Sequence, residues 1–444
     1  MSKRVTQWGV VIALIATGTF VLADISSEPG RLVVWGMNTD PLVMEGAPSG
    51  AFVSLAAGGN VQTLAIRADG TLSLSPAGGL VPAIPDVFAD STFCAVGLGR
   101  NHGLAIRPDG GIVAWPPDAA IGAPTGPFVA VTGARPYHSV ALDTGGNIVV
   151  WPDDPQPPPT GTFKAIAARG RHTLALSEDG NIYGWGTDAS GPAPFGVFAP
   201  TASDAWTPDG SGHFIAPMEP GNPYTAIAAG FDLVVALRAD GSVAQWALTS
   251  DIPAPPDGVF TQVAAGSGFG VGIDPMGRLH AWGKPDRPWV SDDKPAGVYS
   301  AVSAAITHVT AIEAPKRSLW PPNHKMRTVV LTFRADDNCA PVPLSGLSVE
   351  LRSNQPDDGF DSGRTTGDTN GNDGYTEAVV LPARAIDQND DGSFTATFQV
   401  RAERSDALPG PRIYTVAVVS SDGATPPDTH SRVTAQIVVE PDGD

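Results

Sequence analysis

Short runs of alternating apolar and polar residues, each preceded by a turn glycine, recur through most of this chain. Alternation with a period of two predicts β-strands that bury one face. Asp-Gly dipeptides favour tight turns between antiparallel strands, and they occur at 69–70, 109–110, 179–180 and 240–241. The apolar residues two positions after the turn glycines are Leu32, Leu72, Ile112, Ile148, Ile182, Val243 and Leu279. Residues 30–312 are therefore predicted to form a series of antiparallel hairpins.

The hairpins belong to a unit that is repeated seven times. Each unit begins with an aromatic residue and places a small residue twelve or thirteen positions later. The aromatic residues are Phe52, Phe93, Phe128, Phe163, Tyr224, Phe260 and Tyr299, and the small residues are Ala65, Ala105, Ala141, Ala175, Ala236, Gly272 and Ala311. In the first six units a glycine follows five positions later, and after five more come Ser75, Trp115, Trp151, Trp185, Trp246 and Trp282. We expect the small residues to lie where the units crowd around an axis, and the tryptophans to fill the wider gaps between units.

The seventh unit lacks its glycine and tryptophan, while the repeats begin with an unmatched glycine-to-tryptophan strand at residues 30–36. A strand left over at the front and half a unit left over at the back are typical of a circular array closed by its own ends. The pattern predicts an all-β fold with a seven-bladed β-propeller over residues 24–314, in which the N-terminal strand completes the last blade. Trp320 is the alternative partner, but its spacing is off by one and no turn glycine precedes it.

One unit reads Arg-His-Thr-Leu-Ala-Leu-Ser-Glu-Asp-Gly-Asn-Ile-Tyr-Gly-Trp-Gly over residues 171–186. This segment and its degenerate copies over residues 30–312 resemble the repeats of the regulator-of-chromosome-condensation family. The resemblance implies a β-propeller. It also implies protein binding: nuclear relatives are exchange factors for a small GTPase, which does not suit an exported protein, and a secreted bacterial relative inhibits β-lactamase by docking its propeller face on the enzyme.

Residues 1–23 have the composition of a secretory leader. Two basic residues precede an apolar run over 8–22, and small residues occur at a cleavage site before Asp24. The run is short for a transmembrane helix. We therefore expect export to the periplasm, the cell surface or the medium, with no membrane insertion once the leader is cleaved.

The net charge of the chain narrows the range of partners. The formal net charge is −19, and nucleic acid or anionic membranes bind clustered lysine and arginine, so neither is an expected partner.

The two cysteines, Cys94 and Cys339, exclude a framework of disulfides. Cys94 stands where other units carry valine or alanine, which favours a buried apolar role over a single bridge. The sequence leaves the state of both thiols and the oligomeric state open.

The period stops after residue 312, and residues 315–444 contain short alternating strands with turn-rich connections. This pattern predicts a C-terminal antiparallel β-sandwich. The segment Trp-Pro-Pro-Asn-His-Lys at 320–325 resembles the opening of immunoglobulin-like modules related to hyalin repeats in bacterial surface proteins. The resemblance implies a spacer or an adhesive unit.

Two acidic loops of this second domain contain oxygen ligands that suit calcium. One loop has the alternating ligands and following glycine of a calcium loop, but Phe398 stands where a complete loop has a bidentate glutamate. Calcium binding and ordinary solvated turns both stay open, and no other cofactor is expected. The candidate ligands are Asp387, Asn389 and Asp391 in the first loop, and Asp368 and Asn370 in the second.

Four of the eight histidines, His102, His138, His172 and His308, occupy the same place in four units. A position repeated in this way is typical of one structural hydrogen bond made several times rather than of four active sites. The sequence contains no nucleophile elbow, metalloprotease helix or phosphate-binding loop. No catalytic residue is predicted, and the protein is expected not to be an enzyme.

The connection between the fourth and fifth units, residues 187–223, is longer than the others. From Trp185 to Tyr224 is 39 residues, whereas the corresponding intervals elsewhere run from 12 to 18. Long loops on rigid scaffolds often carry binding, and aromatic residues with methionine anchor many interfaces. The alternative is a structural extension that packs on the ring. The candidate binding residues are Phe195, Phe198, Trp206, Phe214 and Met218.

These features predict an exported, non-enzymatic bacterial protein that recognises a protein or a cell-surface polymer with a rigid propeller face. One alternative is a secreted polysaccharide hydrolase or lyase, which would require converging carboxylates in the centre of the ring. A binding surface would instead show exposed aromatic residues, Trp206 among them. A structural cell-surface spacer would show neither. The sequence names neither the partner nor the face that binds it.

Overall fold

The computed structural model describes residues 19–23, 32–36, 48–50, 52–58, 62–76, 79–134, 138–152, 156–170, 172–188, 191–192, 206–247, 250–286, 299–304, 308–313, 316–319, 326–337, 340–341, 344, 347–354, 369, 378–389, 394–401, 412–421 and 430–439. Apart from short 3-10 turns its elements are strands, so the predicted all-β class is confirmed. The chain divides into two compact units: one contains Arg31–Glu313, which we call the propeller, and the other contains Gly18–Gly30 with Ala314–Asp444.

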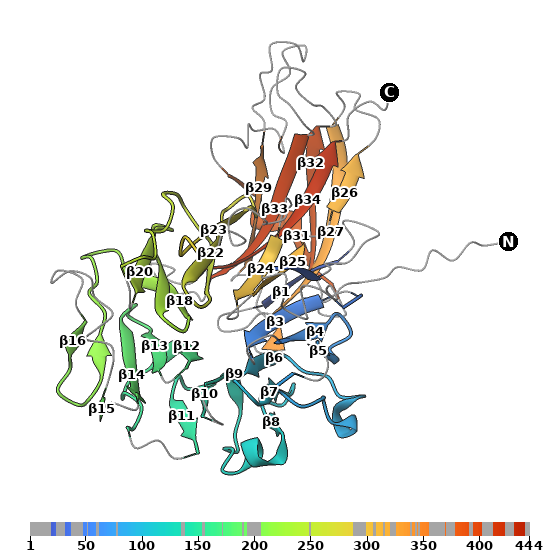
Figure 1. The fold of residues 1–444 in the computed structure, drawn as a ribbon. Coiled ribbons are helices and arrows are strands. Elements are labelled where there is room, and N and C mark those ends of the chain that lie inside the picture. Colours follow the sequence, from blue (N-terminus) through green and yellow to red (C-terminus); the bar gives the residue numbers. More distant parts are fainter. Residues whose placement is uncertain are drawn as a thin grey trace. The chain divides into compact units, whose positions relative to one another are not determined.

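The propeller is built from antiparallel sheets of three consecutive strands, which we call blades. In the first blade, β3 (Phe52–Gly58), β4 (Gln62–Arg67) and β5 (Leu72–Ser75) pair in that order. Figure 1 shows the following blades succeeding one another along the chain. Their strands are β6 (Ala95–Leu98), β7 (Gly103–Ile106) and β8 (Ile112–Trp115); β9 (Phe128–Gly133), β10 (Ser139–Asp143) and β11 (Ile148–Trp151); β12 (Phe163–Arg169), β13 (His172–Ser177) and β14 (Ile182–Asp188); β18 (Tyr224–Ala229), β19 (Leu233–Arg238) and β20 (Val243–Ala247); and β21 (Gln262–Ala265), β22 (Phe269–Ile273) and β23 (Leu279–Gly283).

The seventh of these sheets joins the two ends of the repeat region. β24 (Tyr299–Ala304) pairs with β25 (His308–Glu313), and the other edge of β25 pairs with β2 (Leu32–Gly36). The predicted pairing of the N-terminal strand with the last unit is therefore confirmed. The first strand of each blade contacts the first strand of the next, and β24 contacts β3, so the described blades form a closed ring.

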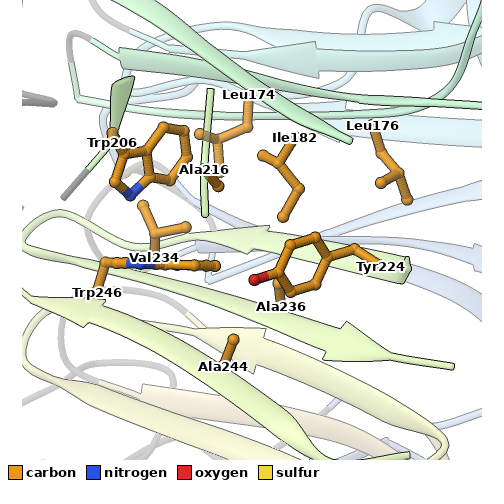
Figure 2. Close-up of a cluster of buried hydrophobic side chains, with 10 residues drawn as sticks. All are labelled: Leu174, Leu176, Ile182, Trp206, Ala216, Tyr224, Val234, Ala236, Ala244 and Trp246. Atoms are coloured by element: carbon orange, nitrogen blue, oxygen red, sulfur yellow. The ribbon is translucent and has the colours of Figure 1, made fainter. Parts of the chain in front are cut away.

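The tryptophan column fills the space between neighbouring blades, as predicted. Each indole packs against aliphatic side chains of the preceding blade. Figure 2 shows one such cluster, in which Trp246 of the fifth blade lies near Leu174 and Ile182 of the fourth. The tryptophans, all at most 5% exposed, are Trp115, Trp151, Trp185, Trp246 and Trp282. Burial of these large side chains on both sides of each blade stabilises the ring.

The column of small residues does not lie at the axis, so that expectation is wrong. These residues lie on the second strand of each blade, whereas the central cavity is lined by first strands. Gly272 shows why the position is small: a Cβ atom there would lie 2.6 Å from the ring of Phe260, the aromatic residue of the same blade. Neighbouring first strands are instead crowded at glycine positions of the first strands themselves. A Cβ atom on Gly97 would lie 2.6 Å from the carbonyl oxygen of Val131.

The second unit contains two sheets. One has the order β1 (Thr19–Ala23), β27 (Met326–Asp337), β32 (Phe394–Arg401) and β31 (Ile386–Gln388), with β28 (Ala340–Pro341) also on β27. The other has the order β26 (Lys316–Leu319), β34 (His430–Val439), β33 (Arg412–Ser421), β29 (Leu347–Ser353) and β30 (Val379–Val380). Buried positions alternate along β29 and β32, as in sheets with one buried face. The resemblance to immunoglobulin-like modules stays a prediction.

The strand β1 lies within the predicted leader. It pairs antiparallel with β27, with Phe20 opposite Ala335. Cleavage after residue 23 would therefore remove one strand from this sheet. Among the described residues, no helix has the length and apolar character that a membrane span requires.

Cys94 is buried at the start of the second blade and is disulfide-bonded. The interpretation of Cys94 as an unbridged apolar residue is therefore wrong. Cys339 lies outside the described residues. The sequence did not predict this disulfide because other units carry valine or alanine at the same packed strand position. A small buried thiol and a small aliphatic side chain fit the same space.

Candidate recognition face of the propeller

The turns that join the first and second strands of the blades meet around the mouth of the central cavity. We call the described residues of these turns, 58, 62, 99–102, 134, 138, 169–170, 172, 230–233 and 266–269, the first-turn face. Neighbouring first strands approach one another closely where they enter these turns: a Cβ atom on Gly230 would lie 2.1 Å from the carbonyl oxygen of Gly266, and one on Gly58 would lie 2.7 Å from that of Leu98. Backbone packing of this kind leaves these strand ends little freedom to move.

The repeated histidines tie adjacent blades together beneath this face. His102 Nε2 lies 3.0 Å from the hydroxyl of Ser139 in the next blade, and His138 Nε2 lies 3.4 Å from the hydroxyl of Thr173 in the blade after that. In the first blade Gln62 occupies the histidine position, and its buried amide bonds the backbone of Pro76 and Val81. The predicted repeated structural hydrogen bond is confirmed for His102 and His138.

Two of these histidines are held neutral. Burial lowers the pKa of His102 to about 4, with a smaller contribution from the charge of His138. Burial likewise lowers the pKa of His172 to about 4, against an opposing hydrogen bond with the backbone of Gly230. Desolvation disfavours the imidazolium form in both places. The shifts therefore result from structural burial and do not indicate catalysis.

The central cavity has a volume of about 240 Å³ and is lined by the first strands of six blades. Its described lining consists of aliphatic side chains, glycine, one threonine and a single charged residue, Arg169. No carboxylate of the described residues lines it, and the sequence of the seventh first strand, residues 299–304, contains no acidic residue. The described lining therefore offers no carboxylate pair of the kind that polysaccharide hydrolysis requires.

Arg169 is a residue that the sequence reasoning missed. It ends the first strand of the fourth blade, where the equivalent residues of the other blades are glycine or alanine: Gly58, Gly99, Ala134, Gly230, Gly266 and Ala305. Its Nη1 donates a hydrogen bond of 3.0 Å to the carbonyl oxygen of Ala57 in the first blade. Because the fourth and first blades are not neighbours in the ring, the side chain reaches across the mouth of the cavity. An alignment of the last residues of the seven first strands would have revealed Arg169 as the exception.

An exposed aromatic ring lies beside this arginine. Phe231, in the equivalent turn of the fifth blade, is 43% exposed, and its ring lies 3.6 Å from the position that a Cβ atom on Gly170 would take. The carboxylate of Asp232 in the same turn accepts from the Gly268 N–H and pairs with Lys284 at 3.2 Å, and the same ammonium lies 3.5 Å from Asp251. Arg100 is exposed in the turn of the second blade. The described part of the first-turn face therefore presents arginine and phenylalanine.

The long connection between the fourth and fifth blades is largely structural where it is described. β17 (Phe214–Ile215) pairs with β14, and β16 (Thr207–Pro208) pairs with β17, so the insertion widens the fourth blade. β15 (Gly191–Pro192) also pairs with β14. These pairings favour the structural alternative that the sequence had left open.

The expected exposed patch in this insertion is not formed by Trp206. Trp206 is only 3% exposed and packs edge-on against Trp246 with ring centroids 5.3 Å apart (Figure 2). An indole inside the cluster between two blades is not available to a partner, so the expectation is wrong for this residue. Phe214 is half-buried and Met218 is exposed. Phe195 and Phe198 lie outside the described residues.

The proposed calcium ligands are only partly described. Asp387 is exposed on β31, and the amide of Asn389 donates to the hydroxyl of Thr395 at 2.9 Å. Asp391, Asp368 and Asn370 lie outside the described residues. No group of three or more histidine, cysteine, aspartate or glutamate side chains that could hold a metal occurs in the described parts of the chain. Calcium binding stays a prediction.

Comparisons with known proteins found one matching family model and several similar solved structures. Residues 163–191 match the "Regulator of chromosome condensation (RCC1) repeat". No curated protein sequence matches the chain. Among solved structures, Prp20p from Saccharomyces cerevisiae, described with its binding properties to Gsp1p and histones, is 16% identical with a TM-score of 0.49 and covers 65% of this chain and 92% of its own. Human WBSCR16 is 16% identical with a TM-score of 0.49, covering 64% and 99%. The chain therefore forms a closed ring of β-blades, and one segment of it is similar to an RCC1 repeat.

Proposed function

We propose that this chain is a non-enzymatic recognition protein that binds another protein through the first-turn face, with Arg169 and Phe231 at the centre of the contact. The observation that carries the proposal is a long arginine at a position that is otherwise glycine or alanine, beside an exposed phenylalanine. Arginine and aromatic side chains dominate the energetics of protein interfaces. A closed ring presents them with little loss of conformational entropy on binding.

The contact is suited to a partner with acidic or carbonyl groups. The Arg169 guanidinium already donates to a neutral carbonyl oxygen, that of Ala57. A carboxylate is a stronger acceptor for the same donors, because charge-assisted hydrogen bonds are about twice as strong as neutral ones. The exposed guanidinium of Arg100 adds to the positive charge of this face on a chain whose net charge is −19.

We also propose that the protein acts outside the cytoplasm. The leader composition of residues 1–23 supports this address. The disulfide at Cys94 supports it independently, because structural disulfides persist mainly in oxidising compartments. The partner is therefore sought among secreted and envelope proteins, with a surface polymer as the competing ligand.

A capture experiment tests the proposal. The bait is the wild-type protein, the double variant Arg169→Ala/Phe231→Ser, or the control Val87→Ser, which changes an exposed residue in the connection between the first and second blades. Secreted and envelope fractions of the source organism are passed over each bait. We expect one protein to be retained by the wild type and the control, and to bind the double variant roughly thirty-fold more weakly, as loss of about 2 kcal/mol at a hot spot implies.

Equal retention by all three baits would contradict the proposal. Retention of polysaccharide in place of protein would overturn the choice of partner. Thermal unfolding of the baits is measured in parallel, so that a folding defect of the double variant is separated from a loss of binding.

A further inference from the structure

The central cavity of the propeller is large enough to hold a small molecule. The residues that line it are the later residues of six first strands, from 55–57 of β3 round the ring to 263–265 of β21. The cavity therefore occupies the half of the ring that is nearest the first-turn face. Its volume of about 240 Å³ corresponds to about eight water molecules at roughly 30 Å³ each.

The described wall of this cavity is aliphatic or glycine apart from two side chains. Leucine, isoleucine, valine and alanine make up most of it, and the polar exceptions are Thr132 and Arg169. The seventh first strand, β24, has the sequence Tyr-Ser-Ala-Val-Ser-Ala, so it adds no charged residue. An apolar wall with one fixed charge is typical of a pocket in which a single polar contact orients an otherwise apolar ligand.

The guanidinium of Arg169 is held at this wall by the opposite side of the ring. Its Nη1 donates to the carbonyl oxygen of Ala57 at 3.0 Å, and both residues line the cavity. A guanidinium is always charged, and its N–H groups form a fork that matches the two oxygens of a carboxylate. A carboxylate inside the cavity would accept a charge-assisted bond in place of the neutral carbonyl, so the site does not require an unused donor.

We propose that the central cavity binds a short aliphatic monocarboxylate. The carboxylate accepts hydrogen bonds from Arg169, and the hydrocarbon chain lies among the aliphatic side chains of the first strands, where it is removed from water. Hexanoate, which has as many non-hydrogen atoms as the cavity has room for waters, matches this site in size and charge. The inference does not rest on the protein contact proposed above. Because Arg169 is common to both, a bound carboxylate would compete with a protein partner for the guanidinium.

Isothermal titration of the isolated full chain with sodium hexanoate tests the site. We expect a single site with a Kd of about 1 mM or tighter, which is within the efficiency that ligands of this size reach. Acetate should bind at least about tenfold more weakly, because it lacks most of the apolar chain. Hexylammonium has the chain but the wrong charge and should not bind. Equal binding of hexanoate and hexylammonium would contradict recognition by Arg169.

The matched variants are Arg169→Gln and the control Arg100→Gln. Arg100 is exposed on the same face but does not belong to the described lining of the cavity, so the two variants remove the same charge from different places. Arg169→Gln should weaken hexanoate binding roughly tenfold or more, as loss of a hydrogen bond to a charged group implies. Arg100→Gln should bind as the wild type does. Unchanged binding by Arg169→Gln, or equal weakening in both variants, would overturn the proposal.

Methyl spectra of the wild-type protein locate the ligand even if Arg169→Gln does not fold. Hexanoate should shift the methyl resonances of Val131 and Val263, which line the cavity, and leave those of Val330, an exposed residue of the second unit, unchanged. Shifts at Val330 alone, or no shift at either cavity valine with hexanoate well above 1 mM, would contradict the proposal. Neither measurement contains a protein partner, so a negative result leaves the proposed recognition function standing.

Discussion

A chain that begins at Met37 is expected not to fold into a stable propeller, whereas a chain that begins at Gly30 is expected to do so. The two truncations differ only by β2 and its flanking residues. β2 supplies the third strand of the last blade, and Leu32 packs with Phe52 and Ala65 of the first blade. Without it β25 keeps its ladder with β24 but the backbone groups on its other edge lose their partners and the ring opens. The expected loss is therefore comparable with a whole domain stability of about 5–15 kcal/mol.

Urea unfolding followed by tryptophan fluorescence measures this difference. The shorter chain should show no cooperative transition, and adding a synthetic peptide of residues 30–37 should restore part of it. Equal midpoints for the two chains would show that closure by the N-terminal strand does not stabilise the ring. Both chains lack β1, so any contribution of that strand cancels in the comparison.

Acid is expected to destabilise the propeller well before its carboxylates are protonated. His102 and His172 have their pKa lowered to about 4 in the folded protein, against about 6.5 in an unfolded chain. Between these values the unfolded state binds protons that the folded state does not, so stability falls as pH falls from about 6.5 towards 4. A difference of this size corresponds to roughly 3 kcal/mol for each histidine once pH 4 is reached.

The change is read from urea midpoints at pH 7.0, 5.5 and 4.5. His102→Gln places at this position the residue that the first blade already uses, Gln62, and should roughly halve the fall in stability, because His172 remains. The control His280→Gln alters a half-exposed histidine and should leave the slope unchanged. A wild-type stability that is constant from pH 7.0 to 4.5 would show that the two imidazoles are not held neutral.

The ring could be predicted from sequence because the same local pattern of residues recurs in successive blades. The period-two alternation defined the strands, and the turn glycines defined the hairpins. The unmatched strand at residues 30–36 predicted the closing pair, which the register of Trp35 with Val309 confirms. The tryptophan column, and the histidine column at His102 and His138, were interpreted correctly because the same environment recurs in several blades, so one physical explanation covers several residues.

The residues of the recognition face could not be predicted in the same way. Arg169 bonds Ala57, 112 positions away in the chain, and no local pattern records a contact across a ring. The prediction that Trp206 is exposed was wrong for a different reason. A tryptophan in a glycine- and proline-rich insertion looks the same in sequence whether it faces solvent or fills a gap, and only the pairing of β16 and β17 with the fourth blade decides between them.

The most direct test of the recognition proposal is site-specific photo-cross-linking. Benzoylphenylalanine is placed at Phe231 or at Val87, two exposed positions on different parts of the propeller, and each protein is irradiated with the secreted and envelope fractions. We predict a discrete cross-linked protein from position 231, none from position 87, and loss of the product from position 231 when Arg169→Ala is added. Cross-links from position 87 alone, or a product from position 231 that is indifferent to Arg169→Ala, would contradict binding through the first-turn face.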